Sequence, residues 1–425
     1  MKLTKLILTA LAGCAVVSSV RAADVTLHLY GSTAYRRASF IAIGNLYGTG
    51  VTNITYATAS AIATTTTTGS GSPAFAASNI LWQGVITTGS LSNKNVNIYC
   101  NWAGSVGGLT SVASDPAETL NVFIPSDGVF AHHSSGTVDV AMADCFQDVT
   151  PVNGNVTGFD TLNESNVAVL EFIWGKGTGS PSTLSNIEPW TADSILALGH
   201  IPMSQFTGNT NDVTNSIYVT GRSDDSGTRI ISETDSHYNV GDAVIQYVTT
   251  ASTYSWYGPG NNIVPGDGDG AISGGTVASA LGAARTPPIV ITDQHSVVTT
   301  NSNAYLIGYV AVTDAMGSAT FNGGEGSNTL STVTGSPTVP LTNWLSYNGV
   351  LFSEPAIRQG AYTDFGFEHC DYNPTLLTDA NKLGFVADYR TKLQAEAGAS
   401  YIPGTMQLGD MNVTRADDGG PVTHN

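Results

Sequence analysis

The chain has 425 residues, of which only 11% are charged and 47 are glycine, and its formal net charge at pH 7 is −18. This length allows two lobes with a sizeable core, and the acidic balance argues against nucleic acid and anionic membranes as partners. A small anion stays compatible with this charge, because backbone N–H groups, hydroxyls and one arginine can form its site in a protein of any net charge.

The N-terminus predicts export. Lys2 and Lys5 precede the apolar run LILTALAGCAVVSSV, and small residues allow cleavage after Ala22. We therefore expect residues 1–22 to be a signal peptide and the mature protein to be periplasmic or extracellular, with a charge of −21 once three basic residues are removed. The alternative is a lipid anchor at Cys14, because LAGC is similar to a lipobox. No other stretch approaches the ~18 uninterrupted apolar residues of a membrane span.

Three cysteines remain in the mature chain, at positions 100, 145 and 370. They form no CxxC motif, so the spacing does not support a zinc site. Their odd number allows one disulfide and a spare thiol without identifying the pair.

The first half of the mature chain alternates strands, small-residue turns and helices. VTLHLY (25–30) predicts a strand, followed by a Gly-Ser-Thr turn and an amphipathic helix. The Thr-rich block 57–78 predicts an exposed excursion with little structure. VNIYCNWA (96–103) predicts a second strand before a turn that opens a helix, and VDVAMAD predicts a short strand that closes at Asp144.

The same alternation returns from residue 167 onward. Residues 250–275 are expected to be rich in loops. The segments expected to form strands or helices are VAVLEFIWGKG, TADSILALG, SIYVTGR, PPIVITD, AYLIGYVAVTD and the C-terminal helix DANKLGFVADYRTKLQAEAG. This order predicts an α/β fold with two similar halves, each built on a parallel sheet whose loops gather at the carboxyl ends of the strands.

Three turns at predicted strand ends have similar chemistry. They are GST (31–33), GSVGG (104–108) and RSDDSGT (222–228), and Asp144 closes VDVAMAD between the second and the third. In order and local spacing, these four motifs resemble the ligand loops of the periplasmic phosphate-binding proteins, the solute receptors of phosphate ABC transporters. The most specific element is an arginine followed four positions later by Ser-Gly-Thr.

The resemblance implies a phosphate site with members from all four motifs: Thr33, Ala34, Ser105, Asp144, Arg222, Ser226, Gly227 and Thr228. It departs from the family in the first loop, where Arg36 and Arg37 stand in place of the usual proline. Weaker similarity continues in AYLIGYVAV and in NGVLFSEPAIRQGAY.

The fold implied is that of type II periplasmic binding proteins, two parallel-sheet lobes joined by a two-stranded hinge with the ligand in the cleft. Lobe I would comprise residues 23–165 and 304–425, and lobe II residues 166–303. The chain would cross between the lobes near Asn166 and return near Ala304.

Phosphate suits this set of side chains. It carries negative oxygens and at least one proton near neutral pH, so a selective site needs many donors and one acceptor. Arg222 offers a planar charged fork, and the helix N-termini after Ser105 and Ser226 offer amides. Asp144 can only accept hydrogen bonds, so fully deprotonated sulfate would leave it unpaired at a cost of ~1–3 kcal/mol.

The implied function is capture of inorganic phosphate for an ABC permease by a monomeric receptor that is not an enzyme and uses no cofactor or metal. Taken alone, RSDDSGT is as often an ordinary helix cap as a binding loop, GSVGG and GST are more often ordinary strand-to-helix turns, and Asp144 is also explained as a cap for the next segment. His132 and His133 lack a third ligand, and GDGDG (266–270) lacks the other positions of an EF-hand. No nucleophile elbow, HExxH or P-loop occurs. The alternatives are a receptor for another oxyanion, or a surface or adhesion protein on the same fold.

Overall fold

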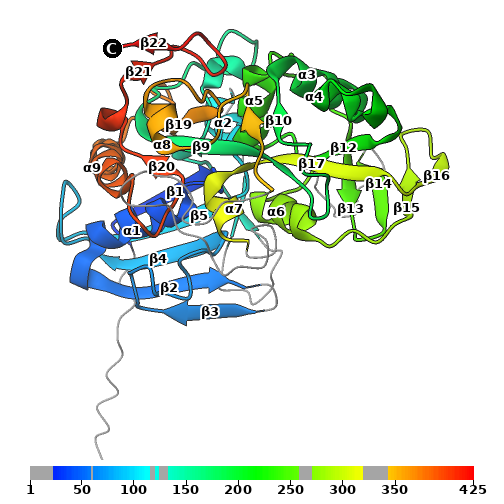
Figure 1. Ribbon diagram of the computed structural model, residues 1–425. Helices are drawn as coiled ribbons and strands as arrows, with labels where there is room; N and C mark the ends of the chain where they lie inside the picture. The colour runs from blue at the N-terminus through cyan, green and yellow to red at the C-terminus, as the bar shows by residue number, and fades with distance from the viewer. Residues whose placement is uncertain (1–22, 59–60, 115–119, 124–132, 258–269, 319–342) are drawn as a thin grey trace, which may run out of the picture.

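The computed structural model describes residues 23–58, 61–114, 120–123, 133–257, 270–318 and 343–425 (Figure 1). The expected signal peptide, the lipobox cysteine Cys14 and His132 lie outside these ranges, as does all but the last residue of GDGDG.

A mixed sheet of twelve strands runs through the whole molecule. The strands of this sheet, in order from one edge to the other, are β11 (His200–Pro202), β12 (Ser216–Thr220), β17 (Ala304–Ala311), β9 (Asn166–Lys176), β19 (Phe365–Asp371), β8 (Val140–Ala143), β1 (Val25–Gly31), β5 (Asn95–Trp102), β4 (Asn79–Val85), β2 (Val51–Ala57) and β3 (Ile62–Thr65). The twelfth strand, β20 (Thr405–Met406), pairs with β9.

The prediction of two separate parallel sheets is wrong, because the main sheet is continuous and mostly antiparallel. Parallel pairing joins β1 to β5 and β8, and β12 to β17. Between these two parallel groups, β9 pairs antiparallel with both β17 and β19, and β19 pairs antiparallel with β8. The α/β class is confirmed, whereas two lobes joined by a hinge are not resolved in the pairing of the strands.

Two hydrophobic cores lie along this sheet, and β9 contributes to both. Leu170 and Phe172 belong to the first core, together with side chains of β1, β5 and β8. Ile173 and Trp174 belong to the second, together with side chains of β12 and β17. The long apolar strand that the sequence predicted from residue 167 is therefore buried, because it lies in the middle of the sheet between the two cores.

Helices cover the sheet on the side of each core. In Figure 1, α1 and α9 lie beside the blue strands, and α6 lies beside β17. The helices are α1 (Arg36–Tyr47), α2 (Ser105–Ala113), α3 (Pro189–Leu198), α4 (Ser204–Thr207), α5 (Gly227–Asp235), α6 (Gly274–Gly282), α7 (Val312–Met316), α8 (Glu354–Arg358) and α9 (Ala380–Glu396), with 3₁₀ turns at Gly48–Gly50, Gln147–Val149, Thr210–Thr214 and Leu408–Asp410.

Smaller sheets complete the described part of the chain. They consist of β13 (Gln246–Thr249), β14 (Thr253–Tyr257), β15 (Ile289–Thr292) and β16 (Val298–Asn301), and of the pairs β6 (Leu120–Phe123) with β7 (His133–Gly136), β10 (Asn186–Ile187) with β18 (Ser346–Tyr347), and β21 (Val413–Thr414) with β22 (Thr423–His424).

Two segments, one expected to have little structure and the other to be rich in loops, contain strands. The Thr-rich block forms β3, which pairs antiparallel with β2 at the edge of the main sheet. Three of its four residues, Ile62, Thr64 and Thr65, are β-branched, which favours a strand. In the stretch 250–275, β14 pairs with β13 and β15.

Two further sequence-based points concern the cysteines and membrane spans. All three cysteines are buried and free, so no disulfide joins them. Among the described residues, every helix is too short or too polar to cross a membrane.

Candidate functional site

Three of the four predicted ligand loops lie at one edge of the sheet. β1 ends at Gly31, β5 ends at Trp102, and β8 ends directly before Asp144. Because β1 pairs parallel with both other strands, their carboxyl ends meet at the same edge. The loops also bond to one another, since the Gly104 amide donates to the Gly31 carbonyl over 3.0 Å.

Asp144 is the centre of the contacts between these loops. The Ser105 hydroxyl donates to Asp144 Oδ1 and accepts a hydrogen bond from the Asp144 amide at 3.2 Å. The Thr228 hydroxyl donates to Asp144 Oδ2 at 3.2 Å. All three side chains are buried. The structure therefore brings three of the predicted site residues together, although they come from three separate parts of the chain.

The N-terminus of α5 also faces Asp144. A Cβ atom added at Gly227 would overlap Asp144 Oδ1 and would lie 2.8 Å from the Ser105 hydroxyl oxygen. Only glycine allows the helix to approach the carboxylate so closely. The first amides of a helix have no partner within the helix, so this approach directs donors and the positive end of the helix dipole at the site.

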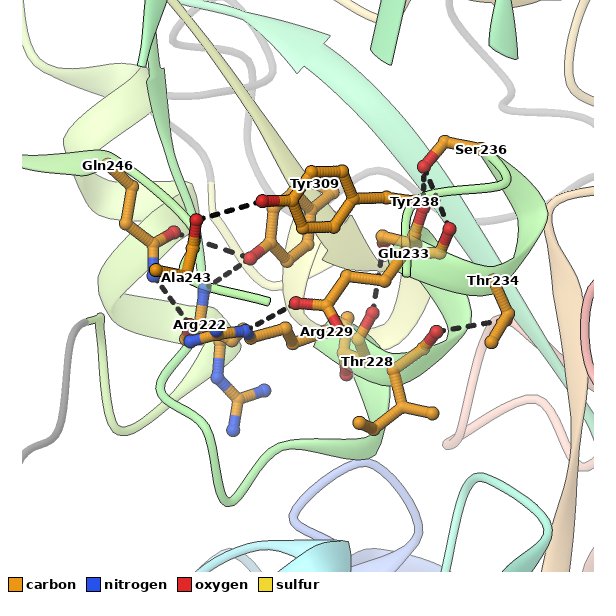
Figure 2. A network of polar contacts seen from close by, with 12 residues as sticks. Arg222, Thr228, Arg229, Glu233, Thr234, Ser236, Tyr238, Ala243, Gln246 and Tyr309 are labelled. Atoms are coloured by element: carbon orange, nitrogen blue, oxygen red, sulfur yellow. Dashed lines mark hydrogen bonds and ion pairs between the residues drawn. The ribbon is translucent and has the colours of Figure 1, made fainter. Parts of the chain in front are cut away.

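Arg222 is held in place by a second set of contacts. Its amide donates to the Tyr309 hydroxyl at 3.3 Å, and its carbonyl accepts from Gln246 at 2.8 Å. Figure 2 shows the guanidinium directed away from these two partners. The guanidinium donates to the carbonyls of Ala271 and Ile272, both at 3.1 Å. The buried Arg222 is thus held beside the start of α5, and two backbone carbonyls fix the orientation of its guanidinium group.

The first predicted loop lies at the same edge but takes a smaller part in the contacts. Thr33 and Ala34 are buried, and the Ala34 amide donates to the Ser32 hydroxyl at 3.1 Å. In the second loop, the Val106 amide donates to the Asp225 carbonyl at 3.0 Å. The amides of Ala34 and Val106, which the sequence assigned to an anion, are therefore engaged by the protein in this structure.

Two buried donors near these loops have no partner among the described residues. They are the Ser226 hydroxyl, at the N-cap of α5, and Nε of Arg36, the first residue of α1. Buried polar groups are almost always hydrogen-bonded in folded proteins. Donors of this kind at a helix N-terminus fit the hydrogen-bonding needs of an oxyanion.

Arg36 is the residue that the sequence did not assign to the site. Burial lowers its pKa, the carboxylate of Asp314 opposes this effect, and the positive charges of Arg37 and Arg222 add to it. The half-buried Arg36 is therefore close enough to the buried Arg222 for their positive charges to repel each other. A signal was present, because Arg36 opens a helix directly after a hydroxyl-bearing turn.

The charge state of Asp144 is set by opposing effects. Burial raises its pKa above the ordinary value, whereas the Ser105 hydrogen bond, the Arg222 guanidinium and the Thr228 hydrogen bond each lower it. Hydroxyl and guanidinium donors stabilise the ionised form of a buried carboxylate. Asp144 is thus a buried carboxylate with partners that favour its role as an acceptor.

No protein-family model and no curated protein matches this chain. Solved structures with a similar fold include a protein assigned as the substrate-binding protein of a phosphate ABC transporter, with bound phosphate, from Clostridium perfringens, and an ABC-type phosphate transport receptor from Vibrio cholerae, both with a TM-score of 0.44. PstS from Borrelia burgdorferi has a TM-score of 0.36. Each is 12% identical, and each alignment covers 90% of this chain and 99% of the other. These likenesses concern the fold alone.

Proposed function

We propose that this protein is an exported receptor that binds inorganic phosphate and is not an enzyme. The observation that carries the proposal is the buried carboxylate of Asp144, which the hydroxyls of Ser105 and Thr228 contact from two other segments. A single acceptor surrounded by donors is the arrangement that a protonated oxyanion requires. The proposed site comprises Thr33, Ala34, Ser105, Asp144, Arg222, Ser226, Gly227 and Thr228.

Phosphate binding would rearrange the hydrogen bonds of the site. The hydroxyls that now donate to Asp144 would turn to the oxygens of phosphate, and the proton of the ligand would take their place on the carboxylate. The buried and unpaired Ser226 hydroxyl supports this proposal, because it is a donor at the N-cap of α5 without a partner in the described part of the chain. Charged hydrogen bonds contribute about 1.5–3 kcal/mol each, so four or five suffice for micromolar affinity.

A receptor for a different oxyanion is the second candidate. The observation in its favour is Arg36, because a second, half-buried arginine near Arg222 adds positive charge that a dianion would use. The role of Asp144 as an acceptor opposes it, because a fully deprotonated oxyanion has no proton to donate to this carboxylate. We favour phosphate for this reason.

The wider role follows from the resemblance of the loops to those of phosphate receptors. We propose a monomer in the periplasm or outside the cell, with lobes formed by residues 23–165 plus 304–425 and by residues 166–303, that delivers phosphate to an ABC permease. The strand β3 and the region around β14 lie in segments that the receptor motifs do not include, and they distinguish this chain from a minimal receptor.

Calorimetric titration with phosphate tests the proposal, after bound anions are removed by unfolding and refolding. We expect one ion per chain with a dissociation constant in the micromolar range, corresponding to about −8 kcal/mol. The variant Ser226→Ala should bind about tenfold more weakly, because one hydrogen bond to a charged ligand is lost. Ser194→Ala is the matched control, since that hydroxyl donates within α3 to the Trp190 carbonyl at 2.8 Å. Absence of phosphate binding in the unmodified protein would refute the proposal.

A further inference from the structure

A second polar cluster lies on the strand next to β8 and does not belong to the proposed anion site. It consists of Glu164, His369 and Asp371, whose ligand-type atoms all lie within 4.8 Å of one another. His369 and Asp371 are fully buried on β19, and Glu164 is partly exposed. The cluster therefore combines one imidazole with two carboxylates in the interior, with one member at the surface.

The backbone places these three side chains together. His369 and Asp371 are two residues apart on β19, so both point to the same face of the sheet. The register between β19 and β9 shifts at Glu368/His369, a bulge that changes the direction of the following side chains. The segment before β9 is fastened to the end of β19, because the Cys370 amide donates to the Ser165 carbonyl at 3.0 Å. This fastening brings Glu164 against the strand.

The carboxylates are each anchored on one oxygen. The Gln147 amide donates to Glu164 Oε1 at 2.6 Å, and the Ser165 amide donates to Asp371 Oδ1 at 3.2 Å. Backbone amides of this kind fix the orientation of ligand carboxylates in metal sites and leave the second oxygen available.

Three atoms of the cluster are buried without partners. Asp371 Oδ2 and both ring nitrogens of His369 have no hydrogen-bond partner among the described residues. The ring of Phe146 packs edge-on against His369, with 4.3 Å between the ring centres, and offers no hydrogen bond. Leaving such groups unpaired in the interior is costly, so the cluster requires something that interacts with nitrogen and oxygen lone pairs at once.

We propose that Glu164, His369 and Asp371 bind a divalent transition-metal cation such as Zn²⁺ or Mn²⁺. An imidazole nitrogen together with carboxylate oxygens is a common ligand set for these ions, whereas Ca²⁺ and Mg²⁺ prefer oxygen alone. Bonds of about 2.1 Å require the ligand atoms to lie about 3.4 Å apart in a tetrahedron. Small rotations of the side chains would close the cluster to this spacing.

The surroundings favour a cation. Asp148 lies near enough to Glu164 to raise the pKa of its carboxyl, after the larger effect of burial. Asp148, Asp417 and Asp418 line a hollow on this side of the molecule. A carboxylate such as that of Asp148, near the partly exposed Glu164, attracts cations. The metal would link β19 to the segment before β9 and so stabilise the middle of the main sheet.

Binding of Zn²⁺ and Mn²⁺ to the full untagged chain, freed of metal by a chelator, tests this proposal. We expect one ion per chain, with a dissociation constant of about 1 μM or below, and a rise in melting temperature on addition of Zn²⁺. Co²⁺ should give the visible absorption of nitrogen and oxygen ligation, without the near-ultraviolet band of a thiolate. The absence of that band would show that the ion is bound by the cluster and not by any of the three free cysteines.

Two variants locate the ion. Glu164→Gln and His369→Gln should each weaken binding at least about tenfold. Glu171→Gln is the matched control, because Glu171 is a buried carboxylate on β9 whose two oxygens also lack partners in the described chain, yet it is not part of the cluster. It should bind metal as the unmodified protein does. Glu164 is partly exposed, so Glu164→Gln decides the question even if His369→Gln fails to fold.

Three results would overturn the proposal. The first is no saturable binding of either ion by the unmodified chain. The second is equal binding by Glu164→Gln and the unmodified chain, which would place the ion at another site. The third is a thiolate band with Co²⁺. None of these results bears on phosphate binding, because the cluster shares no residue with the proposed anion site.

Discussion

Asp144 and Asp371 are both buried carboxylates at the ends of neighbouring strands, and they have opposite surroundings. Asp144 accepts hydrogen bonds from two hydroxyls and lies near the Arg222 guanidinium. Asp371 has one oxygen bonded to a backbone amide and the other unpaired, beside an imidazole that is also unpaired. Burial alone therefore does not define a site. The donors around a buried carboxylate decide which ligand it suits. Many donors favour a protonated oxyanion, and few donors favour a metal cation.

The pKa shifts of buried groups follow the same division. At Asp144, hydroxyls and a guanidinium oppose the effect of burial. At Glu171, burial raises the pKa of the carboxyl well above its ordinary value, and only the positive charge of Arg358 opposes it. Burial lowers the pKa of His369 to about 3, so its ring is neutral at neutral pH. The donors of the anion site thus offset part of the effect of burial on the pKa of Asp144, which stays above its ordinary value, whereas the central strands offer their carboxyls little opposition to it.

The largest effect is expected at the closest contact of the proposed anion site. Gly227→Ala should weaken phosphate binding at least about a hundredfold, because the new methyl group overlaps the Asp144 carboxylate, and a hundredfold loss corresponds to about 2.7 kcal/mol. Gly275→Ala is the control, since its Cβ would meet only the Ser273 hydroxyl oxygen at 3.8 Å, also near the start of a helix. Calorimetry measures the phosphate affinity of both variants. Equal affinities would show that Gly227 is not part of the phosphate site.

The second prediction concerns the selectivity of Asp144. In Asp144→Asn, the ratio of phosphate to sulfate affinity should fall about tenfold to a hundredfold, because the amide can donate to a fully deprotonated oxyanion. Asp224→Asn, an exposed carboxyl in the loop before α5, should keep the ratio of the unmodified protein. Competition titrations measure both. An unchanged ratio in Asp144→Asn would contradict the role of Asp144 as the acceptor.

The buried carboxyls whose pKa burial raises well above the ordinary value should make stability depend on pH. Burial raises the pKa of Glu171 and Glu368, so the folded state keeps protons that the unfolded state releases. The free energy of unfolding should therefore fall as pH rises from about 6.5 to 8.5, by about 1.4 kcal/mol per pH unit for each retained proton. Histidines oppose this slope only near the acid end of the range, because unfolded histidines are half protonated at about pH 6.5 and largely neutral above about pH 7.5.

Urea unfolding of metal-free protein at both ends of this range measures the slope. Glu171→Gln should reduce it by about one proton, while a carboxyl with strong donors, such as Asp144, should contribute less. A free energy of unfolding that is constant or rises with pH would show that these carboxyls are ionised in the folded protein, and the comparison between the two regions would lose its basis.

The smallest effect is expected at Arg36. Arg36→Gln should weaken phosphate binding about fivefold, corresponding to about 1 kcal/mol, because it removes one of two positive charges near the site. Arg37→Gln is the control, since that guanidinium packs over the Phe75 ring at 5.8 Å. Tighter binding in Arg36→Gln would indicate that the repulsion between Arg36 and Arg222 outweighs the benefit of the second charge.

Local sequence signals predicted most of the elements that position the site. The helix α9, the buried strand β9 and the short strand that ends before Asp144 all lie within a few residues of the expected positions. These elements depend on periodicity and turn residues close in sequence, which a single chain displays. Glycine before Ser105 and Ser226 before α5 likewise mark the helix starts that the structure contains.

The features that the sequence did not reveal depend on distant contacts. The antiparallel pairing of β9 with β17 and β19 joins two groups of parallel strands into one sheet, and nothing local distinguishes it from two separate sheets. The metal-type cluster joins Glu164 to β19 from a distant part of the chain. Arg36 was noticed only as a departure from a pattern, since the burial of its Nε atom follows from packing around the start of α1.

A crystal structure of the chain grown with phosphate, after removal of other anions, tests the central claim most directly. The account predicts one phosphate at the N-terminus of α5, with an oxygen about 2.5–2.7 Å from the Asp144 carboxylate, as expected for an O–H···O⁻ hydrogen bond, and with the Ser226 hydroxyl and the Arg222 guanidinium as donors. Phosphate bound away from Asp144, or a site at α5 that stays without phosphate at saturating concentration, would contradict it.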